Sequence, residues 1–389
     1  MIFKDYRQLI RSVDTPSRDY TGIIRYENWT AIPHGHPETV LLSIIECIHD
    51  NQVFVVLYPN ENPEELKPQI DKLLTELAPE RIDFFMRSSG SSGRPKFVAR
   101  TLESWIRSFS AHRDAFGLSS TKSVFIPGPM VYSANLYHSL LSIWLHQKVY
   151  LCQSTHTATQ TRAIQTYDID TLFTVPTRLD LLFRTEHNLV SIKKIITVGE
   201  RLQSQTIRFV IRHPNLVAYH YYGASELGQV SFAAYDEILH HSTLLGQPFD
   251  GVKIGISNKK DIIVTSEYAA VGYKDQGTVF DKGDLIDGLL YFKGRSDEQL
   301  NHYGRKIDLT PVRELLQEQP SVKGYCLRLH TSDKKEHYSI HIHSDEKLNE
   351  SVLQSIHRIH KPSHITYYKS VVLTSAGKCD WNTTIKKRA

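Results

Sequence analysis

The sequence predicts a large N-terminal α/β domain, in which helices flank parallel sheets and a small β subdomain is attached, followed by a small C-terminal α+β domain. Three observations carry this prediction. Apolar runs alternate with helix-like segments up to residue 221, short strands separated by Gly and Asp turns dominate from residue 246, and a second mixture of strands and helices follows residue 294. We therefore expect residues 1–296 to form the large domain and residues 297–389 the small one.

Length and composition limit the kinds of protein that this chain represents. With 389 residues, 40% hydrophobic content and 23% charged content, it is typical of a soluble globular protein of two or three domains. The net charge of +4 gives no support to nucleic-acid binding. Four scattered cysteines without C-x-x-C spacing predict reduced thiols rather than a zinc site. Because no signal-peptide core or membrane span is found, we expect a cytoplasmic protein.

The elements of the large domain follow from hydrophobic periodicity. Helical periodicity over residues 39–47 precedes an apolar run at residues 53–58, typical of a buried parallel strand, and a second helical segment at residues 63–77. The same alternation continues downstream, and it predicts a parallel sheet between layers of helices. We expect strands at residues 123–126, 149–152, 171–175, 194–198 and 216–221, and helices at 136–145, 162–165 and 179–183.

The C-terminal part of the sequence changes in texture. Residues 252–256, 261–265 and 289–293 predict the short strands of the β subdomain. The segment Gly294-Arg295-Ser296-Asp297 has the composition of a joint between domains. Beyond it, helices are expected at residues 311–317 and 350–359, and strands at 324–329 and 337–343.

The serine- and glycine-rich run at residues 88–96 carries the clearest chemical signal. Glycines let backbone amides approach an anion, serines add donors, and Lys96 adds a positive charge, which together suit a polyphosphate. The spacing is not that of a Walker A loop, because two residues separate Gly90 from Gly93. Alone, such a run is more often a flexible loop. The strand-like residues 82–86 before it and the motifs downstream favour a phosphate loop.

Six segments in order resemble the motifs of the AMP-forming acyl- and aryl-CoA synthetases, adenylation domains and luciferases, the adenylate-forming superfamily. Taken singly, each segment also reads as ordinary surface or core, but six in sequence make chance a poor explanation. The resemblance runs from residue 28 to the C-terminus and is nearest to acyl- or aryl-CoA ligases, with a shortened N-terminal region. The segments are residues 88–96, 222–226 (Tyr-Gly-Ala-Ser-Glu), 283–285 (Gly-Asp-Leu), 294–297, 304–307 and 374–378.

The resemblance implies an enzyme that uses ATP, Mg²⁺ and CoA. Such an enzyme activates a carboxylic acid to an acyl-adenylate and then transfers the acyl group to CoA. Lys378, Lys96 and Glu226 would be catalytic, Glu226 would also hold Mg²⁺, and the small domain would turn about a hinge at Asp297. The residues implied to bind the nucleotide are Ser88, Ser89, Gly90, Ser91, Ser92, Gly93, Gly199, Glu200, Tyr222, Gly223, Ala224, Ser225, Asp284 and Arg295.

Roles follow for individual nucleotide-binding residues from the same resemblance. Tyr222 would stack on adenine, and Ser225 would donate its hydroxyl to the α-phosphate. Asp284 would accept both ribose hydroxyls, since an ionised carboxylate only accepts hydrogen bonds. Arg295 would offer a planar fork to ribose or phosphate oxygens.

The acid is expected to have an uncharged tail. No acidic residue occurs between Lys122 and Tyr167, so the ammonium group of an amino acid would be buried without a counter-charge. A fatty or aryl acid is therefore favoured. The expected lining residues are Tyr132, Ser133, Tyr137 and Tyr221.

Two alternatives and three departures from the family pattern stay open at this point, and one departure is Leu300-Asn301, which stands where the family has Ile-Lys after the hinge. The chain would instead load an acyl carrier protein as a stand-alone adenylation enzyme, or act as a non-catalytic adenylate-binding scaffold. About one strand–helix unit of the family is missing near the N-terminus. In the family this part forms one wall of the acyl pocket and of the thiol tunnel, and a homodimer would supply that wall. Phe97 stands where the family has glycine after the loop lysine.

Overall fold

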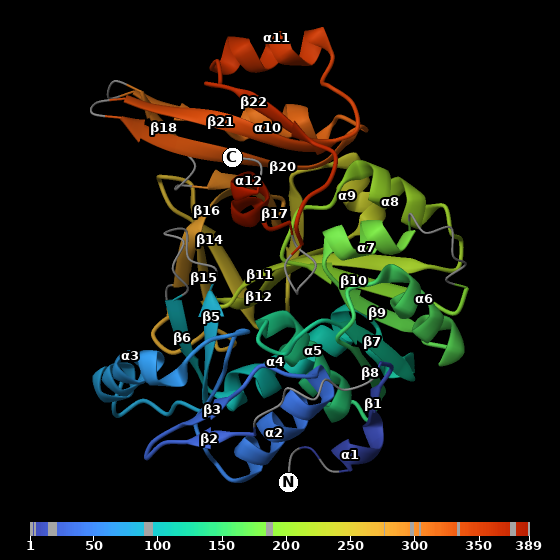
Figure 1. Ribbon diagram of the computed structural model, residues 1–389, viewed down its shortest axis with the longest axis vertical. Coiled ribbons are helices and arrows are strands. Elements are labelled where there is room, and N and C mark those ends of the chain that lie inside the picture. The colour runs from blue at the N-terminus through green and yellow to red at the C-terminus, as the bar shows by residue number, and fades with distance from the viewer. Residues whose placement is uncertain are drawn as a thin grey trace.

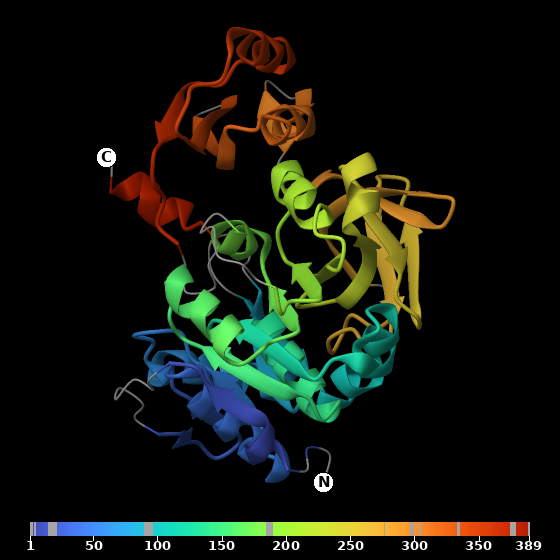
Figure 2. The same ribbon diagram turned by 90° about the vertical axis from the view of Figure 1, so that its right-hand side faces the viewer.

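The computed structural model describes most of the chain. The described residues are 3, 5–14, 22–88, 96–183, 190–275, 277–295, 299–302, 305–332, 335–373 and 379–387. Within them the strands form a 12-stranded sheet and two five-stranded sheets (Figure 1). The N-terminal elements and the C-terminal sheet lie at opposite ends of the molecule in both views (Figures 1 and 2).

The first five-stranded sheet carries the expected phosphate loop. Its central strands are parallel, and its last two strands form an antiparallel pair, β5–β6, whose register sets Ser88 opposite Lys96. Helices α2 (Pro37–His49) and α3 (Pro63–Glu76) connect the parallel strands. The strand order is β2 (Ile24–Arg25), β3 (Thr30–Ile32), β4 (Phe54–Val56), β5 (Phe84–Ser88) and β6 (Lys96–Arg100).

The 12-stranded sheet begins with six parallel strands. These are, in spatial order, β1 (Ile10–Ser12), β8 (Lys148–Cys152), β7 (Ser123–Pro127), β9 (Thr171–Thr174), β10 (Lys194–Val198) and β11 (Val217–Ala224). The sheet continues with antiparallel strands, which include the expected β subdomain. They are β12 (Gly228–Ala234), β13 (Leu244–Pro248), β17 (Leu289–Arg295), β16 (Gly277–Ile286), β15 (Asp261–Ser266) and β14 (Val252–Ile256).

Helices cover both faces of the parallel part of this sheet. Along β7, Val124 and Ile126 pack in one hydrophobic cluster while Phe125 packs in another, as the two-residue period of a strand requires. The first cluster includes residues of α2, α4 and α5, and the second those of α6 to α9. The covering helices are α4 (Leu102–Ala115), α5 (Ser133–Trp144), α6 (Thr157–Thr166), α7 (Pro176–Phe183), α8 (Ser204–Ile211) and α9 (Tyr235–His240).

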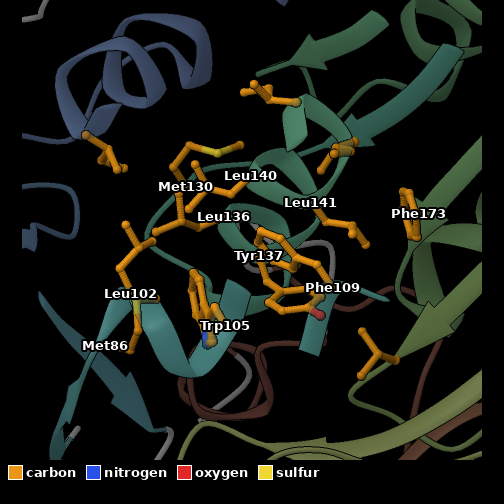
Figure 3. Packing of buried hydrophobic residues seen from close by; sticks show 14 of the residues in the cluster. Met86, Leu102, Trp105, Phe109, Met130, Leu136, Tyr137, Leu140, Leu141 and Phe173 are labelled. Carbon is orange, nitrogen blue, oxygen red and sulfur yellow. The ribbon is translucent and has the colours of Figure 1, made fainter. Parts of the chain in front are cut away.

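Aromatic side chains form the centre of the first cluster. Tyr137 of α5 lies between Trp105 and Phe109 of α4, with ring centroids 5.4 Å from each (Figure 3). Helix α4 begins at an N-cap, Thr101, whose hydroxyl accepts from the backbone N–H of Ser104 at 3.1 Å. The α4–α5 contact therefore fixes both helices against the face of the sheet that carries Val124 and Ile126.

The C-terminal sheet pairs only within itself among the described residues. One face packs against α10 (Thr310–Gln317) and α11 (Glu350–Ile359) through a cluster that includes Ile340 and Ile342. The terminal helix α12 (Trp381–Lys386) contacts the sheet through Trp381, whose ring lies 6.0 Å from that of Tyr368. The strands are β18 (Gln299–His302), β19 (Arg305–Asp308), β20 (Val322–Ser332), β21 (Lys335–Ser344) and β22 (Ile365–Tyr368).

The structure bears out the predicted fold class. Three predicted elements, residues 194–198, 252–256 and 350–359, have the expected bounds. In the part of the chain that is described, no helix is long and apolar enough to cross a membrane.

Buried histidines make the stability of this fold depend on pH. Burial lowers the pKa of His220 and of His341 to about 4 each, so both are neutral in the folded protein. An unfolded histidine has a pKa of about 6.5, so the unfolded state binds more protons below that pH. Stability contributed by each neutral, buried histidine is complete above pH 6.5 and is lost as pH falls towards 4.

We expect the free energy of unfolding to fall between pH 6.5 and 4.5, by about 1.4 kcal/mol per pH unit for each buried histidine at most. The substitution His220→Gln should make this fall shallower, because glutamine does not titrate. Urea unfolding midpoints at pH 7 and pH 5 would measure the effect. An equal loss of stability in the variant and the unaltered protein would contradict it.

Candidate active site

The carboxyl ends of the parallel strands meet at one edge of the large sheet. Strands β7, β10 and β11 end at Pro127, Val198 and Ala224. The last residues of these strands, together with the segments that follow them, contain most of the site residues predicted between residues 123 and 226. Parallel sheets bind ligands at this edge, because the strand ends and the loops after them face the same side.

Residues 222–226 form a tight corner between β11 and β12. Tyr222, Gly223 and Ala224 end β11, and the N–H of Leu227 donates to the carbonyl of Ala224 at 3.2 Å to close the turn. A Cβ on Gly223 would lie 2.5 Å from the carbonyl oxygen of Gly228, so this position requires glycine. The motif glycine is thus explained by the close approach of the two strands.

Glu226 lies at the tip of this corner and is half-buried. Its carbonyl accepts from the N–H of Ala270 at 2.8 Å, which fastens the turn to the loop after β15. The pKa of Tyr273 is raised by burial and, to a lesser degree, by the charge of Glu226. The carboxylate therefore lies near Tyr273, and the backbone of the turn is fixed.

Ser225 connects the corner to α5 and to the first sheet. Its hydroxyl oxygen lies 3.3 Å from that of Ser133, and the hydroxyl points to the carbonyl of Arg87 at 3.4 Å. Arg100, at the end of β6, donates from Nε at 2.9 Å and from Nη2 at 2.8 Å to the carbonyl of Ser225. The strand that begins with Lys96 is therefore tied directly to the corner.

Tyr222 makes a contact that the sequence did not indicate. Its hydroxyl donates to Oδ2 of Asp281 at 2.7 Å. Asp281 lies in β16, is only 7% exposed, and stands opposite Arg295 of β17 in the strand register. A buried carboxylate beside Tyr222 is well suited to accept hydrogen bonds from the hydroxyl groups of a ligand.

Asp284, the carboxylate expected at the ribose, has different surroundings. Lys260 lies 2.7 Å from one carboxylate oxygen and Lys293 lies 3.5 Å from the other. The hydrogen bond from Lys260 is the main cause that lowers the pKa of Asp284. The charge of Asp284 is therefore balanced by two lysines. Asp284 lies three residues after Asp281, the aspartate that contacts Tyr222.

Gly199 and Glu200 follow β10 at the same edge. Gly199 has a φ of +87°, a backbone conformation that favours glycine. Glu200 accepts from the backbone N–H of Thr177 at 3.1 Å and from its hydroxyl at 2.8 Å. The carboxylate of Glu200 thus stabilises the start of α7. The same contact holds residues 199–200 at the edge of the sheet.

The predicted phosphate loop joins β5 to β6. Ser89, Gly90, Ser91, Ser92 and Gly93 lie outside the described residues, as does the side chain of Ser88, while Lys96 is exposed at the start of β6.

The guanidinium of Arg87, in β5, lies 4.9 Å from the ring centre of Tyr58 and 4.7 Å from that of Phe97. Arg87 also pairs with Glu61 at 2.5 Å. Phe97, which stands where the family has glycine, therefore packs against the buried guanidinium of Arg87.

The four residues predicted for the acid pocket fall into two groups. Tyr132 and Ser133, at the start of α5, are half-buried, and Ser133 lies beside Ser225. Tyr137 and Tyr221 are 2% and 4% exposed and belong to the aromatic core. Tyr221 contacts His138 with 3.2 Å between its hydroxyl oxygen and Nε2, and burial raises its pKa well above the usual value.

Both predicted site residues of the small domain fall outside the described part of the chain. They are Lys378 and the predicted hinge residue Asp297, and the side chain of Arg295 is not described either. Cys379, the residue after Lys378, has its pKa raised by burial first and by the charge of Glu200 second. Cys379 is therefore near Glu200.

A Mg²⁺ ion fits the donor set at this edge only when a ligand supplies further oxygens. Among the described residues, no group of three or more His, Cys, Asp or Glu side chains is arranged to hold a metal. Mg²⁺ commonly uses one or two carboxylates together with substrate phosphates and water. Glu226 fits that pattern as the single protein carboxylate.

The sequence matches a known family and several known proteins. A family model described as "AMP-binding enzyme" matches residues 27–266. The uncharacterized acyl-CoA ligase YhfT of Bacillus subtilis (strain 168) is 30% identical over 293 residues, 71% of this chain and only 61% of that protein. The putative long chain fatty acid-CoA ligase VraA of Staphylococcus aureus (strain MRSA252) is 22% identical over 315 residues, 75% of this chain and 68% of that protein.

Solved structures share the fold. The O-succinylbenzoate coenzyme A synthetase MenE of Bacillus subtilis, in complex with ATP and magnesium ion, matches with a TM-score of 0.75 and 16% identity, over 91% of this chain and 88% of that one. The amide bond synthetase McbA of Marinactinospora thermotolerans matches with a TM-score of 0.66 and 16% identity, over 86% and 79%. From the family match over most of its length, the chain belongs to the AMP-binding enzymes.

Proposed function

We propose that this protein is an AMP-forming acid–thiol ligase that activates a fatty or aryl acid with ATP and passes the acyl group to CoA. One observation carries the proposal: the fixed corner with Ser225 and Glu226 lies beside the Tyr222–Asp281 pair at the carboxyl edge of the sheet. The names of YhfT and VraA as acyl-CoA ligases support the reaction class. The complex of MenE with ATP and magnesium ion supports both as ligands of this fold.

In the first half-reaction, an oxygen of the substrate carboxylate attacks the α-phosphorus of ATP. The bond to the β-phosphate oxygen breaks, and pyrophosphate leaves with its electron pair. Lys96 would neutralise charge on the leaving group, Ser225 would donate to the α-phosphate, and Lys378 would bridge the carboxylate and the phosphate. Mg²⁺ supplies charge neutralisation at the phosphates, and Glu226 would hold it.

We assign the ribose to Asp281 rather than to Asp284. Asp281 is buried and accepts from the Tyr222 hydroxyl at 2.7 Å, so a nucleoside stacked on that ring would bring its ribose close to this carboxylate. A carboxylate accepts several hydrogen bonds at once, so Asp281 can accept one from a ribose hydroxyl in addition to the one from Tyr222. Asp284 is already paired with Lys260 and Lys293.

In the second half-reaction, the thiol of CoA attacks the acyl carbonyl and AMP leaves. We propose that residues 297–389 rotate as a unit about Asp297 between the two steps, which removes Lys378 and admits the thiol. The separate pairing of β18–β22 supports such a unit. A carrier protein's pantetheine is the second candidate acceptor, favoured by 23% identity to a linear gramicidin synthase of Brevibacillus parabrevis over 72% of this chain.

We expect AMP and pyrophosphate to form from ATP and Mg²⁺ only when a suitable acid is present. A panel of fatty and aryl acids, assayed with and without CoA, measures this. Faster AMP release with CoA supports the acid–CoA ligase. Pyrophosphate exchange that CoA does not stimulate favours the carrier-protein acceptor. ATP binding without turnover of any acid would contradict the ligase and favour a scaffold.

The ribose assignment predicts a difference between two aspartates. Replacing Asp281 with Ala removes the acceptor and should weaken ATP binding about 10-fold or more, the effect of losing a hydrogen bond to a charged group. The matched variant Asp284→Ala should change it less than about threefold. Calorimetric titration with ATP compares them. The reverse order of the two losses would restore the ribose role to Asp284.

The role of Lys378 predicts a large loss in the adenylation step alone. We expect Lys378→Ala to slow acid-dependent pyrophosphate exchange by about 10²–10³-fold, since one preorganised charge-stabilising donor contributes this much. The exposed Lys387 is the control position, and Lys387→Ala should retain the exchange rate. Near-normal exchange in the Lys378 variant would remove the assigned role.

A further inference from the structure

Arg100 is the most deeply buried cation near the candidate site. It ends β6, the strand that begins with Lys96, and it is 1% exposed. Burial is the main cause that lowers the pKa of Arg100, to about 10, so the guanidinium still carries its charge at neutral pH. Burying a charge is costly unless its hydrogen bonds are all made.

The hydrogen bonds of Arg100 go to the backbone of the corner and of the neighbouring loop. Nε and Nη2 both donate to the carbonyl of Ser225, at 2.9 and 2.8 Å. Nη1 donates to the carbonyl of Tyr268 at 2.9 Å and to the hydroxyl of Ser104 at 3.2 Å. Within the described parts of the chain no carboxylate pairs with Arg100 within 4.0 Å.

These contacts hold Glu226 from both sides. Arg100 fixes the carbonyl immediately before Glu226, and the N–H of Ala270 fixes the carbonyl of Glu226 itself at 2.8 Å. Tyr268 and Ala270 belong to one loop, so Arg100 binds the corner and the loop together. The Glu226 charge opposes the lowering of the Arg100 pKa, which indicates that carboxylate and guanidinium are near each other.

We propose that Arg100 is a positioning residue that orients the Glu226 carboxylate for the metal–ATP complex, a role that rests on the proposed function. Its planar fork sets two donors on one carbonyl and leaves a third nitrogen for a second carbonyl, a geometry that lysine does not reproduce. Because Lys96 and Arg100 share one strand, the same contact fixes the spacing between the phosphate-loop lysine and the metal carboxylate.

The energetic consequence is a coupling between Arg100 and the metal. ATP alone does not require Glu226 in a fixed orientation, whereas ATP with Mg²⁺ does. Removing Arg100 should therefore weaken binding of the metal complex more than binding of free ATP. An arginine that only stabilises the fold would lower both affinities alike, or neither.

The test compares ATP affinity with and without Mg²⁺ by calorimetry in Arg100→Met and Arg100→Lys. We expect the strengthening that Mg²⁺ gives to ATP binding to shrink at least about fivefold in Arg100→Met, the lower range of a typical coupling. Arg100→Lys should retain part of it, and it remains a folded probe where Arg100→Met does not fold.

The matched control is Gln147→Met, which also loses a buried hydrogen bond. Gln147 is 3% exposed and donates to the carbonyl of Leu118 at 2.9 Å, next to the first residue of β8 and so at the amino edge of the parallel strands. It should lower the melting temperature while the effect of Mg²⁺ on ATP binding stays that of the unaltered protein.

Two results would overturn the proposal. In the first, Mg²⁺ strengthens ATP binding in both Arg100 variants as much as it does in the unaltered protein. In the second, Mg²⁺ does not change ATP binding in the unaltered protein. Failure of the ligase reaction is separate from both. If no acid yields AMP but the Mg²⁺ effect is lost with Arg100, the positioning role stands and the proposed reaction falls.

Discussion

The hydrogen bonds between parallel strands bring the segments of the candidate site together. Five parallel strands, β7 to β11, end at one edge, so the loops that follow them meet although they are far apart in the sequence. The corner after β11 depends on this arrangement, and it is further tied to β6 through Arg100 and to the loop after β15 through Ala270. Three separate segments thus hold one short turn, which is the preorganisation that charge stabilisation in catalysis requires.

Much of the fold could be predicted from the sequence, because buried strands and amphipathic helices have strong hydrophobic periodicity. Strand β10 and helix α11 have the expected bounds for this reason. Helix α4 was not predicted, since its apolar positions are interrupted by buried serines and by His112. These polar residues are accommodated by tertiary contacts, such as the 2.8 Å contact between Ser108 and Tyr137, that no local pattern reveals.

The candidate site shows a similar division. The corner at residues 222–226 could be located by its motif, and its glycine is explained by the close approach of Gly228. The carboxylate that we propose for the ribose could not, because Asp281 and Asp284 lie three residues apart and the Gly-Asp pair matches the motif at Asp284. Only the fold distinguishes a buried aspartate beside Tyr222 from one paired with lysines. The structural reason for Phe97, where the motif has glycine, is also visible only in the fold: its ring packs on Arg87.

The most direct measurement of nucleotide binding at this edge is a crystal structure of the protein with ATP and Mg²⁺. We expect adenine against the ring of Tyr222, a ribose hydroxyl within hydrogen-bond distance of Asp281, and the metal on Glu226. A nucleotide bound elsewhere, or a ribose held by Asp284 with Asp281 unengaged, would contradict the site described here.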